Sequence, residues 1–325
     1  MRAPIQLLIA EPKDFSPRAI RILERFAEVD LRECSRDDMR TALAEYDVVW
    51  FRLGHRIDRD LLNGQTRCRM IATPVTGIDH VDLWACAERG IRVVSLRGEF
   101  EFLKRVRATA ELTVGLTLAL LRHIPRAAES VISGQWDRDL FRGRELFDKT
   151  AGIVGMGRLG RIVSEYLRAF GMNVVGYDPR PDFPTETARR VRSLFELLEQ
   201  SDVVSIHVKY DDTTRHLFRH QHFQRMKPGA VLVNTSRGGI VDDQALLDAL
   251  ESGHLGGAAL DVLDGEPRIA RDHPLVTYAR EHDNLLIVPH IGGNTVESFE
   301  KTESFLALRV MELVHTGALA SPLRV

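Results

Sequence analysis

The sequence predicts an α/β fold with two doubly wound parallel-sheet domains. Residues 1–95 alternate short apolar runs with helical patterns, and the same alternation resumes after residue 149. Alternating strands and helices build parallel sheets that are covered by helices on both faces. The length of 325 residues fits about two such domains.

The first half of the chain contains four short apolar runs that we expect to be strands. They occupy residues 5–10, 48–51, 70–73 and 92–95. Helices are expected at 16–27, where a serine and a proline suit the first turn, and at 80–89, which ends at a glycine. A longer helix is expected at 108–121. Its nearly continuous apolar surface predicts burial, which two domains meeting around it would supply.

The second half repeats the pattern with six expected strands. They occupy residues 151–154, 173–177, 203–207, 230–234, 258–261 and 285–289. Helices are expected at 194–199, 242–252 and 296–313. The last helix either extends the second domain or crosses back to the first, and we favour the crossing. The predicted domains are therefore 1–97 with 297–325, and 98–296.

Three glycines follow the strand at 151–154 in the spacing of a dinucleotide-binding turn. Gly155 suits a tight turn, Gly157 lets the backbone approach a pyrophosphate, and Gly160 lets helix and strand pack closely. The helix that follows would direct its free N–H groups at the phosphates. The order of strand, glycines, helix, strand and acid favours this interpretation over an ordinary glycine-rich turn with a solvated acid.

The acid of this pattern is Asp178, which ends the next strand and lies 21 positions after Gly157. A carboxylate there accepts a hydrogen bond from a ribose diol and repels a 2′-phosphate, so it favours NAD. Arg180 follows closely and offers an alternative partner for such a phosphate. We expect NAD to be the cofactor.

Composition excludes several other classes of protein. The net charge of -2 gives no electrostatic reason to expect nucleic acid. Cys34, Cys68 and Cys86 have neither metal-ligand spacing nor an even number, so we expect no metal site and a reducing cytoplasm. The longest membrane-like stretch, 112–121, is too short to span a bilayer.

Three residues at neighbouring strand ends form a coherent catalytic set, although each alone has an ordinary structural explanation. Ligands of open parallel sheets bind beyond the carboxyl ends of the strands. Arg237 offers a bidentate fork for a substrate carboxylate or its neighbouring carbonyl. His290 can exchange a proton with a hydroxyl, and Glu266 would orient the ring and favour its protonated form. Oxidation of a 2-hydroxy acid requires these groups.

The sequence resembles the D-isomer-specific 2-hydroxyacid dehydrogenases. The motifs that carry the resemblance lie at residues 75–82, 109–112, 155–160, 176–178, 234–238, 261–267 and 289–293. The resemblance implies two Rossmann-like domains with the active site in a cleft between them, and a homodimer. It implies Arg237, Glu266 and His290 as the catalytic residues.

The resemblance also implies the binding residues. The residues expected to contact NAD are Gly155, Gly157, Arg158, Leu159, Gly160, Asp178, His207, Thr235, Ser236, Asp261 and Gly292. The residues expected to face the substrate are Arg52, Val75, Thr76 and Gly77.

Within the family, residues 110–113, 124–125, 134–136 and 143–146 look most like D-3-phosphoglycerate dehydrogenases. The chain stops at Val325, so we expect no appended regulatory domain. Two segments depart from the family pattern. Residues 95–107 are longer and more charged than usual, so their basic residues either meet an unusual acidic substrate or form a solvated helix start. These are Arg97, Lys104, Arg105 and Arg107. The usual His-x-Pro is His207-Val-Lys209 here.

The sequence therefore predicts a cytoplasmic, NAD-dependent oxidoreductase that interconverts a D-2-hydroxy acid and a 2-oxo acid. A phosphoglycerate-like or sugar-derived acid is the expected substrate class. The alternative is an NAD(H)-sensing interaction protein, because the family includes corepressors that keep the catalytic residues.

Overall fold

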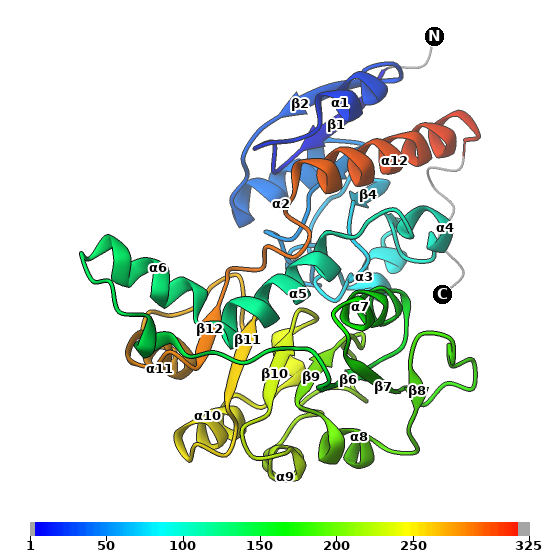
Figure 1. The fold of residues 1–325 in the computed structure, drawn as a ribbon. Coiled ribbons are helices and arrows are strands. Elements are labelled where there is room, and N and C mark those ends of the chain that lie inside the picture. Colours follow the sequence, from blue (N-terminus) through cyan, green and yellow to red (C-terminus); the bar gives the residue numbers. More distant parts are fainter. Residues whose placement is uncertain (1–3, 318–325) are drawn as a thin grey trace. The chain divides into compact units, whose positions relative to one another are not determined.

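The chain folds into two compact units. The computed structural model describes residues 4–317. Unit 1 holds the described residues up to 106 together with those from 295 onward, and unit 2 holds residues 107–294. Figure 1 shows that each unit is a sheet with helices packed on it.

Unit 1 is built on a five-stranded parallel sheet with the strand order β2-β1-β3-β4-β5. Its strands are β1 Ile5–Ile9, β2 Ala27–Leu31, β3 Val48–Trp50, β4 Met70–Thr73 and β5 Arg92–Ser95. Its helices are α1 Pro17–Leu23, α2 Arg36–Glu45, α3 Leu83–Glu88, α4 Phe100–Leu103 and α12 Val296–His315. Strand β2 has no counterpart among the predicted strands, because this edge strand is largely exposed and carries no apolar run.

The two faces of this sheet bury separate apolar clusters. In β1, Leu8 belongs to one cluster, whereas Leu7 and Ile9 belong to the other. This division follows from the alternation of side chains along a strand. The second cluster includes Leu306 and Val310 of α12, which packs beside α1. Unit 1 therefore combines segments from both ends of the described chain.

Unit 2 is built on a seven-stranded parallel sheet with the strand order β12-β11-β10-β9-β6-β7-β8. Its strands are β6 Thr150–Val154, β7 Asn173–Tyr177, β8 Arg189–Arg190, β9 Val203–Ile206, β10 Val231–Asn234, β11 Gly257–Leu260 and β12 Leu285–Ile287. Six of them match the predicted strands. The seventh, β8, is a two-residue edge strand that is too short to leave a sequence signal.

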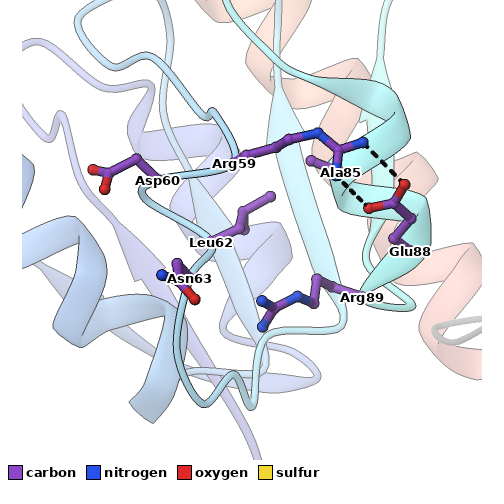
Figure 2. A pocket seen from close by; sticks show the side chains of 7 residues that line it. All are labelled: Arg59, Asp60, Leu62, Asn63, Ala85, Glu88 and Arg89. Atoms are coloured by element: carbon purple, nitrogen blue, oxygen red, sulfur yellow. Dashed lines mark hydrogen bonds and ion pairs between the residues drawn. The ribbon is translucent and has the colours of Figure 1, made fainter.

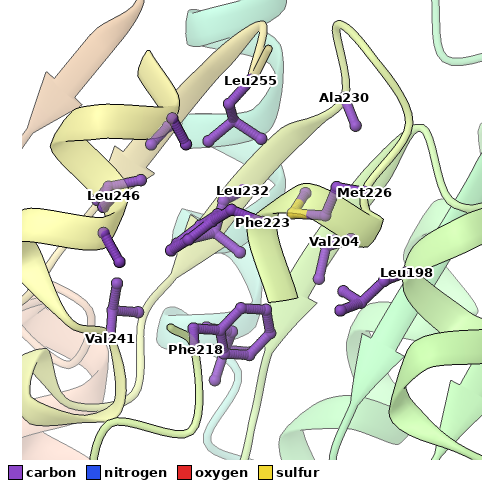
Figure 3. Packing of buried hydrophobic residues seen from close by; sticks show 14 of the residues in the cluster. Leu198, Val204, Phe218, Phe223, Met226, Ala230, Leu232, Val241, Leu246 and Leu255 are labelled. Atoms are coloured by element: carbon purple, nitrogen blue, oxygen red, sulfur yellow. The ribbon is translucent and has the colours of Figure 1, made fainter. Parts of the chain in front are cut away.

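The helices of unit 2 cover this sheet. They are α5 Ala108–Leu121, α6 Ile124–Ile132, α7 Arg158–Ala169, α8 Leu194–Gln200, α9 His220–Arg225, α10 Asp243–Glu251 and α11 Pro274–Glu281, with short 3₁₀ turns at Arg138–Phe141 and Gly238–Ile240. Figure 3 shows part of the core, where Phe218, Phe223 and Leu246 pack around Leu232 of β10.

The apolar surface of α5 is buried within unit 2 itself. The helix packs on β10, β11 and β12 and against α7. Leu116 and Leu120 lie in the same cluster as Val233 and Ala259 of the sheet. The prediction was that two domains meeting around this helix would bury it, but the sheet of unit 2 already does so.

The first boundary between the units lies later in the chain than the prediction at residue 97. The segment after β5 continues into α4, whose Leu103 is buried in the core of unit 1. Phe102 stacks on Phe305 of α12 with ring centroids 3.9 Å apart. These contacts keep residues 98–106 with unit 1. No helix within residues 4–317 is long and apolar enough to cross a membrane.

Candidate active site

The glycine turn joins β6 to α7 in unit 2. Gly155 has a φ of +94°, a backbone conformation that glycine adopts without strain, and a Cβ there would lie 2.7 Å from the carbonyl oxygen of His207. A Cβ at Gly160 would lie 2.0 Å from the carbonyl oxygen of Gly155. The turn therefore requires glycine at both places, as the motif predicts.

Gly157 leaves open space above the turn. Among the described residues, the nearest atom to a Cβ built there is Nη2 of Arg180, at 3.9 Å. Gly157 is also the N-cap of α7, and no side chain caps that helix. No capping side chain therefore competes with an anion for the first turn of α7.

The strand order places this turn where the chain changes direction. From β6 the chain continues to β7 and β8 on one side and returns to β9 on the other. Ligands of open parallel sheets bind at such a switch point, beyond the carboxyl ends of the strands. The glycine turn and His207 follow β6 and β9 and lie at this point.

Asp178 follows β7 and is held beside the glycine turn. Its Oδ2 accepts a hydrogen bond of 2.9 Å from the backbone N–H of Met156. Burial opposes ionisation of this carboxyl, but hydrogen bonds from the Arg180 side chain and from two backbone amides hold the pKa of Asp178 below its usual range. The carboxylate lies where the motif predicts a ribose acceptor.

His290 and Glu266 form the closest pair among the predicted catalytic residues. Nδ1 of His290 lies 2.8 Å from Oε1 of Glu266, and each side chain is 25% exposed. His290 follows β12 and has a φ of +52°, which is uncommon for a residue with a side chain. Its backbone N–H donates to the carbonyl oxygen of Asp261 at the end of β11.

Asp261 fixes the backbone that follows His290. Its carboxylate accepts hydrogen bonds from the N–H of Ile291 at 2.6 Å and from that of Gly292 at 2.9 Å. Asp261 is buried, and burial raises its pKa to about 6 against the opposing effect of the Ile291 N–H. A Cβ at Gly292 would lie 2.7 Å from this carboxylate. Asp261 and Gly292 thus position the histidine loop.

Arg237 follows β10, the neighbour of β11. Its backbone carbonyl accepts from the side chain of Asn234, and its Nη1 donates to the carbonyl oxygen of Ser236. The next residue, Gly238, packs so closely on the 261–266 loop that a Cβ would lie 2.0 Å from the carbonyl carbon of Leu263. The turn that carries Arg237 therefore lies against the loop that carries Glu266.

His207 and the threonine pair line the same edge of the sheet. Nε2 of His207 lies 2.8 Å from Oγ of Ser205, whereas its Nδ1 is buried without a hydrogen-bond partner among residues 4–317. Burial lowers the pKa of His207 to about 3, so the ring is neutral at physiological pH. Thr235 shares a hydrogen bond of 2.9 Å with Thr113 of α5.

Comparisons with known proteins agree with this geometry. A family model described as "D-isomer specific 2-hydroxyacid dehydrogenase, NAD binding domain" matches residues 114–292. The chain belongs to the D-isomer specific 2-hydroxyacid dehydrogenase family. The matched range lies within unit 2 and contains the glycine turn, Asp178, Arg237, Glu266 and His290.

Relatives of known activity match nearly the whole chain. A D-3-phosphoglycerate dehydrogenase of Methanocaldococcus jannaschii is 34% identical over 97% of this chain. The chain spans only 58% of that relative's length. A hydroxypyruvate reductase of Thermotoga maritima is 32% identical over 89% of this chain and 92% of its own length.

Solved structures share the two-domain α/β fold. The TT0316 protein of Thermus thermophilus is 34% identical, with a TM-score of 0.83 over 98% of this chain and 99% of its own. A D-lactate dehydrogenase from Aquifex aeolicus, solved with NAD and lactic acid, is 28% identical, with a TM-score of 0.80 over 96% of each chain.

The residues of unit 2 fit a bound NAD. The open space over Gly157 and the uncapped first turn of α7 suit a pyrophosphate, and Asp178 suits a ribose hydroxyl. The orphaned Nδ1 of His207 is a buried polar atom at the same edge. Arg158 and Leu159, which are predicted to contact NAD, lie on the first turn of α7.

The predicted substrate residues lie in unit 1, where Arg52 is already engaged. Arg52 follows β3, and its Nη2 lies 2.7 Å from Oε1 of the buried Glu303 of α12. Its Nη1 donates to the carbonyl oxygens of Glu11 and Lys13. Val75, Thr76 and Gly77 follow β4 in a loop that is partly exposed.

The basic residues of the 95–107 segment do not form one cationic cluster. Nζ of Lys104 pairs with Glu101 on the same short helix. Arg107 lies against Tyr166 and Glu165 of α7 within unit 2. Arg105 contributes its backbone carbonyl to Lys301.

Unit 1 also contains a shallow hollow outside the predicted site. Its volume is about 340 Å³, and Arg59, Leu62, Glu88 and Arg89 contribute to its lining (Figure 2). Two hydrogen bonds join Arg59 to Glu88, and Arg89 donates to the carbonyl oxygen of Gly64. Arg59, Glu88 and Arg89 thus already have partners, and nothing in the lining of the hollow indicates a ligand.

Two functional features escaped the sequence analysis. One is the role of Asp261, which holds the histidine loop through two backbone amides. The other is the close engagement of Arg180 with Asp178. The separation of two residues between them was visible in the sequence, but the direction of the arginine side chain was not.

Proposed function

We propose that this protein is an NAD-dependent oxidoreductase that interconverts a D-2-hydroxy acid and a 2-oxo acid. The observation that carries the proposal is the pair of His290 and Glu266, 2.8 Å apart, in the domain that holds the glycine turn. Imidazole and carboxylate in this arrangement form a general acid–base group. Family membership, and relatives named as dehydrogenases and reductases, agree with this chemistry.

The ring of His290 has one nitrogen left for chemistry. Glu266 engages Nδ1, so Nε2 is the atom that exchanges a proton with the substrate hydroxyl or carbonyl oxygen. The nicotinamide of NAD, when bound, supplies the hydride acceptor. Oxidation of the hydroxy acid would thus transfer the hydroxyl proton to Nε2 of His290, and reduction of the oxo acid would return that proton from the ring.

Arg237 is proposed to bind the substrate carboxylate or the adjacent carbonyl oxygen. A guanidinium fork matches a carboxylate in a bidentate way and stabilises negative charge that develops on the oxygen. The backbone of its turn is fixed by Asn234 and by the close packing of Gly238. These contacts limit where the guanidinium can lie.

The proposed substrate is a small 2-oxo acid of the phosphoglycerate or sugar-acid type. Relatives are named D-3-phosphoglycerate dehydrogenase, hydroxypyruvate reductase and glyoxylate reductase, which share a short 2-hydroxy or 2-oxo acid. Arg52, Val75, Thr76 and Gly77 are proposed to contact the substrate. The cytoplasm is the proposed location.

A second copy of this chain is the proposed partner. Helix α6 and the segment after it expose large apolar side chains that unit 2 does not cover. These are Ile124, Val131, Ile132, Trp136 and Leu140. Apolar surface of this extent is typical of an interface, and a homodimer would bury it. Light scattering that gives a monomer mass at micromolar concentration would contradict this part of the proposal.

The test of the activity is an NADH-oxidation screen over 2-oxo acids. Glyoxylate, hydroxypyruvate, pyruvate and 3-phosphohydroxypyruvate are assayed separately, with the absorbance of NADH as the readout. We expect turnover of at least one acid and formation of the corresponding 2-hydroxy acid, in the D configuration where that product is chiral. NADH binding without turnover of any 2-oxo acid would contradict the enzyme and favour the NAD-sensing alternative.

A further inference from the structure

The adenosine end of the cofactor site contains an arginine whose position bears on cofactor choice. We propose that Arg180 is a specificity-determining residue that lets this site bind NADP(H) as well as NAD(H). This inference deepens the proposed function and rests on its dinucleotide site.

Arg180 grips the carboxylate of Asp178 with a two-point fork. Its Nε lies 3.0 Å from Oδ1 and its Nη2 lies 2.9 Å from Oδ2. The backbone N–H of Arg180 donates to Oδ1 as well, and that of Met156 donates to Oδ2. The carboxylate therefore accepts four hydrogen bonds, which is about the number that its lone pairs provide.

A ribose hydroxyl can reach Asp178 only by replacing one of these donors. Two of the donors are backbone amides, which the turn and the strand end hold in place. The side chain of Arg180 is 53% exposed, whereas that of Asp178 is 8% exposed. The arginine fork is thus the donor that can move, and binding of NAD(H) is expected to displace it in part.

A 2′-phosphate would meet a different arrangement. The fork of Arg180 already points at the ribose acceptor, and a guanidinium binds phosphate in a bidentate way. The positive charge of Arg180 also compensates the charge of Asp178, which otherwise repels a 2′-phosphate. The side chain of Arg180 therefore weakens the contact of Asp178 with a ribose hydroxyl of NAD(H) and supplies a contact to the 2′-phosphate of NADP(H).

Two more arginines reinforce this end of the site. Nη2 of Arg190, on β8, donates to the carbonyl oxygens of Asp178 and Arg180. Arg161, on α7, donates to the carbonyl oxygen of Met156. The acidic groups that face them are Asp178 and Asp182, the latter 4.0 Å from Arg180. Three cations against two carboxylates leave a net positive charge where the 2′-phosphate would bind.

The test measures binding of NADH and NADPH to the whole protein by titration calorimetry. Adenosine 2′,5′-bisphosphate and ADP are used as fragments that lack the nicotinamide. The native protein is expected to bind NADPH within about tenfold of NADH. Arg180→Ala is expected to weaken NADPH and the 2′,5′-bisphosphate by about 10- to 100-fold, the range for a lost charged hydrogen bond. NADH should bind as tightly as before, or more tightly.

The matched control is Arg189→Ala. Arg189 neighbours Arg190 on β8, but its side chain donates to Gln200 instead of the Asp178 loop. This variant removes one positive charge from the same edge and should leave the NADPH-to-NADH ratio unchanged. Equal weakening of both cofactors in Arg180→Ala, or a native protein that binds NADH but not NADPH, would overturn the inference and leave the proposed function intact. Failure to bind either cofactor would overturn both.

Discussion

The two units place a charged residue beyond the end of a sheet strand in opposite ways. In unit 1, Arg52 follows β3 and is paired with Glu303, whose side chain is fully buried. In unit 2, His290 follows β12 and is paired with Glu266, and both side chains remain 25% exposed. The first ion pair is thus largely buried, and the second is partly exposed to solvent.

The difference shows how one architecture serves two purposes. Glu303 also accepts from the backbone N–H of Ser16, so it ties α12 both to β3 and to the start of α1. A buried carboxylate with those partners fixes the chain. The carboxylate of Glu266 instead holds Nδ1 of a partly exposed ring, and in the proposed function the other nitrogen transfers the proton. The degree of burial therefore distinguishes the structural pair, Arg52 with Glu303, from the proposed catalytic pair, His290 with Glu266.

The largest expected effect is on catalysis, from His290→Gln. The amide cannot exchange a proton, so kcat should fall by about 10²- to 10⁴-fold, the usual contribution of a general acid–base residue. The fold should persist, because the side chain is not in either apolar core of unit 2. Steady-state kinetics with the best acid of the screen provides the measurement.

Binding of NADH serves as the control for this variant. The glycine turn and Asp178 are untouched, so the affinity for NADH should change by less than about threefold, well under one hydrogen bond. Retained turnover in His290→Gln would mean that the histidine takes no part in catalysis. The difference in burial between the two ion pairs would then have no catalytic consequence.

The next effect is on stability, from Glu303→Ala. Removing one partner of a buried ion pair leaves an uncompensated charge and costs about 3–5 kcal/mol. The variant leaves the guanidinium of Arg52, which is 14% exposed, without its carboxylate and the backbone N–H of Ser16 without its acceptor. Urea unfolding followed by intrinsic fluorescence should show the loss. Glu300→Ala, on the same helix but 55% exposed and 4.0 Å from Arg18, should cost less than about 1 kcal/mol.

A double variant separates the structural role of Arg52 from a role in substrate binding. Replacing Arg52 and Glu303 together by leucine leaves no unpaired charge, and such replacements are often close to neutral. If Arg52 also binds the substrate, the KM for the oxo acid should rise in this folded variant while NADH affinity stays constant. An unchanged KM would mean that Arg52 has only the structural role of pairing with Glu303.

Much of unit 2 could be predicted from the sequence because its signals are local. The glycine spacing, the buried apolar strands and Asp178 all lie within about thirty residues, and each has a backbone reason. The pairing of His290 with Glu266 was also predictable, since both follow adjacent strand ends in the topology that the motif implies. Local geometry and strand order together define this part of the site.

The remainder depended on side-chain directions that a sequence does not specify. Nothing local indicates that Glu303, on the last described helix, meets Arg52 and Ser16, which lie 251 and 287 positions away. The fork of Arg180 on Asp178 is similar, because an arginine two residues from an acid can point in several directions. The edge strands β2 and β8 were missed because edges need little apolar surface.

The smallest expected effect concerns pH and the imidazole of His207, whose Nδ1 is buried. Its pKa is about 3 in the folded protein because burial disfavours the charged ring, against an ordinary value of 6.5. Between these values the unfolded chain binds a proton that the folded protein does not, so stability is lost as the pH falls from 6.5 toward 3. From pH 6.5 to pH 5 the loss from this group should reach about 1–2 kcal/mol.

In His207→Gln the urea midpoint should therefore fall less over that range than in the native protein. His220→Gln, which removes an exposed imidazole bonded to Asp248, is the matched control. If the urea midpoints of the native protein and His207→Gln fall in parallel with pH, the folded protein accepts a proton on His207 as readily as the unfolded chain does. Burial would then have no effect on the protonation of this ring.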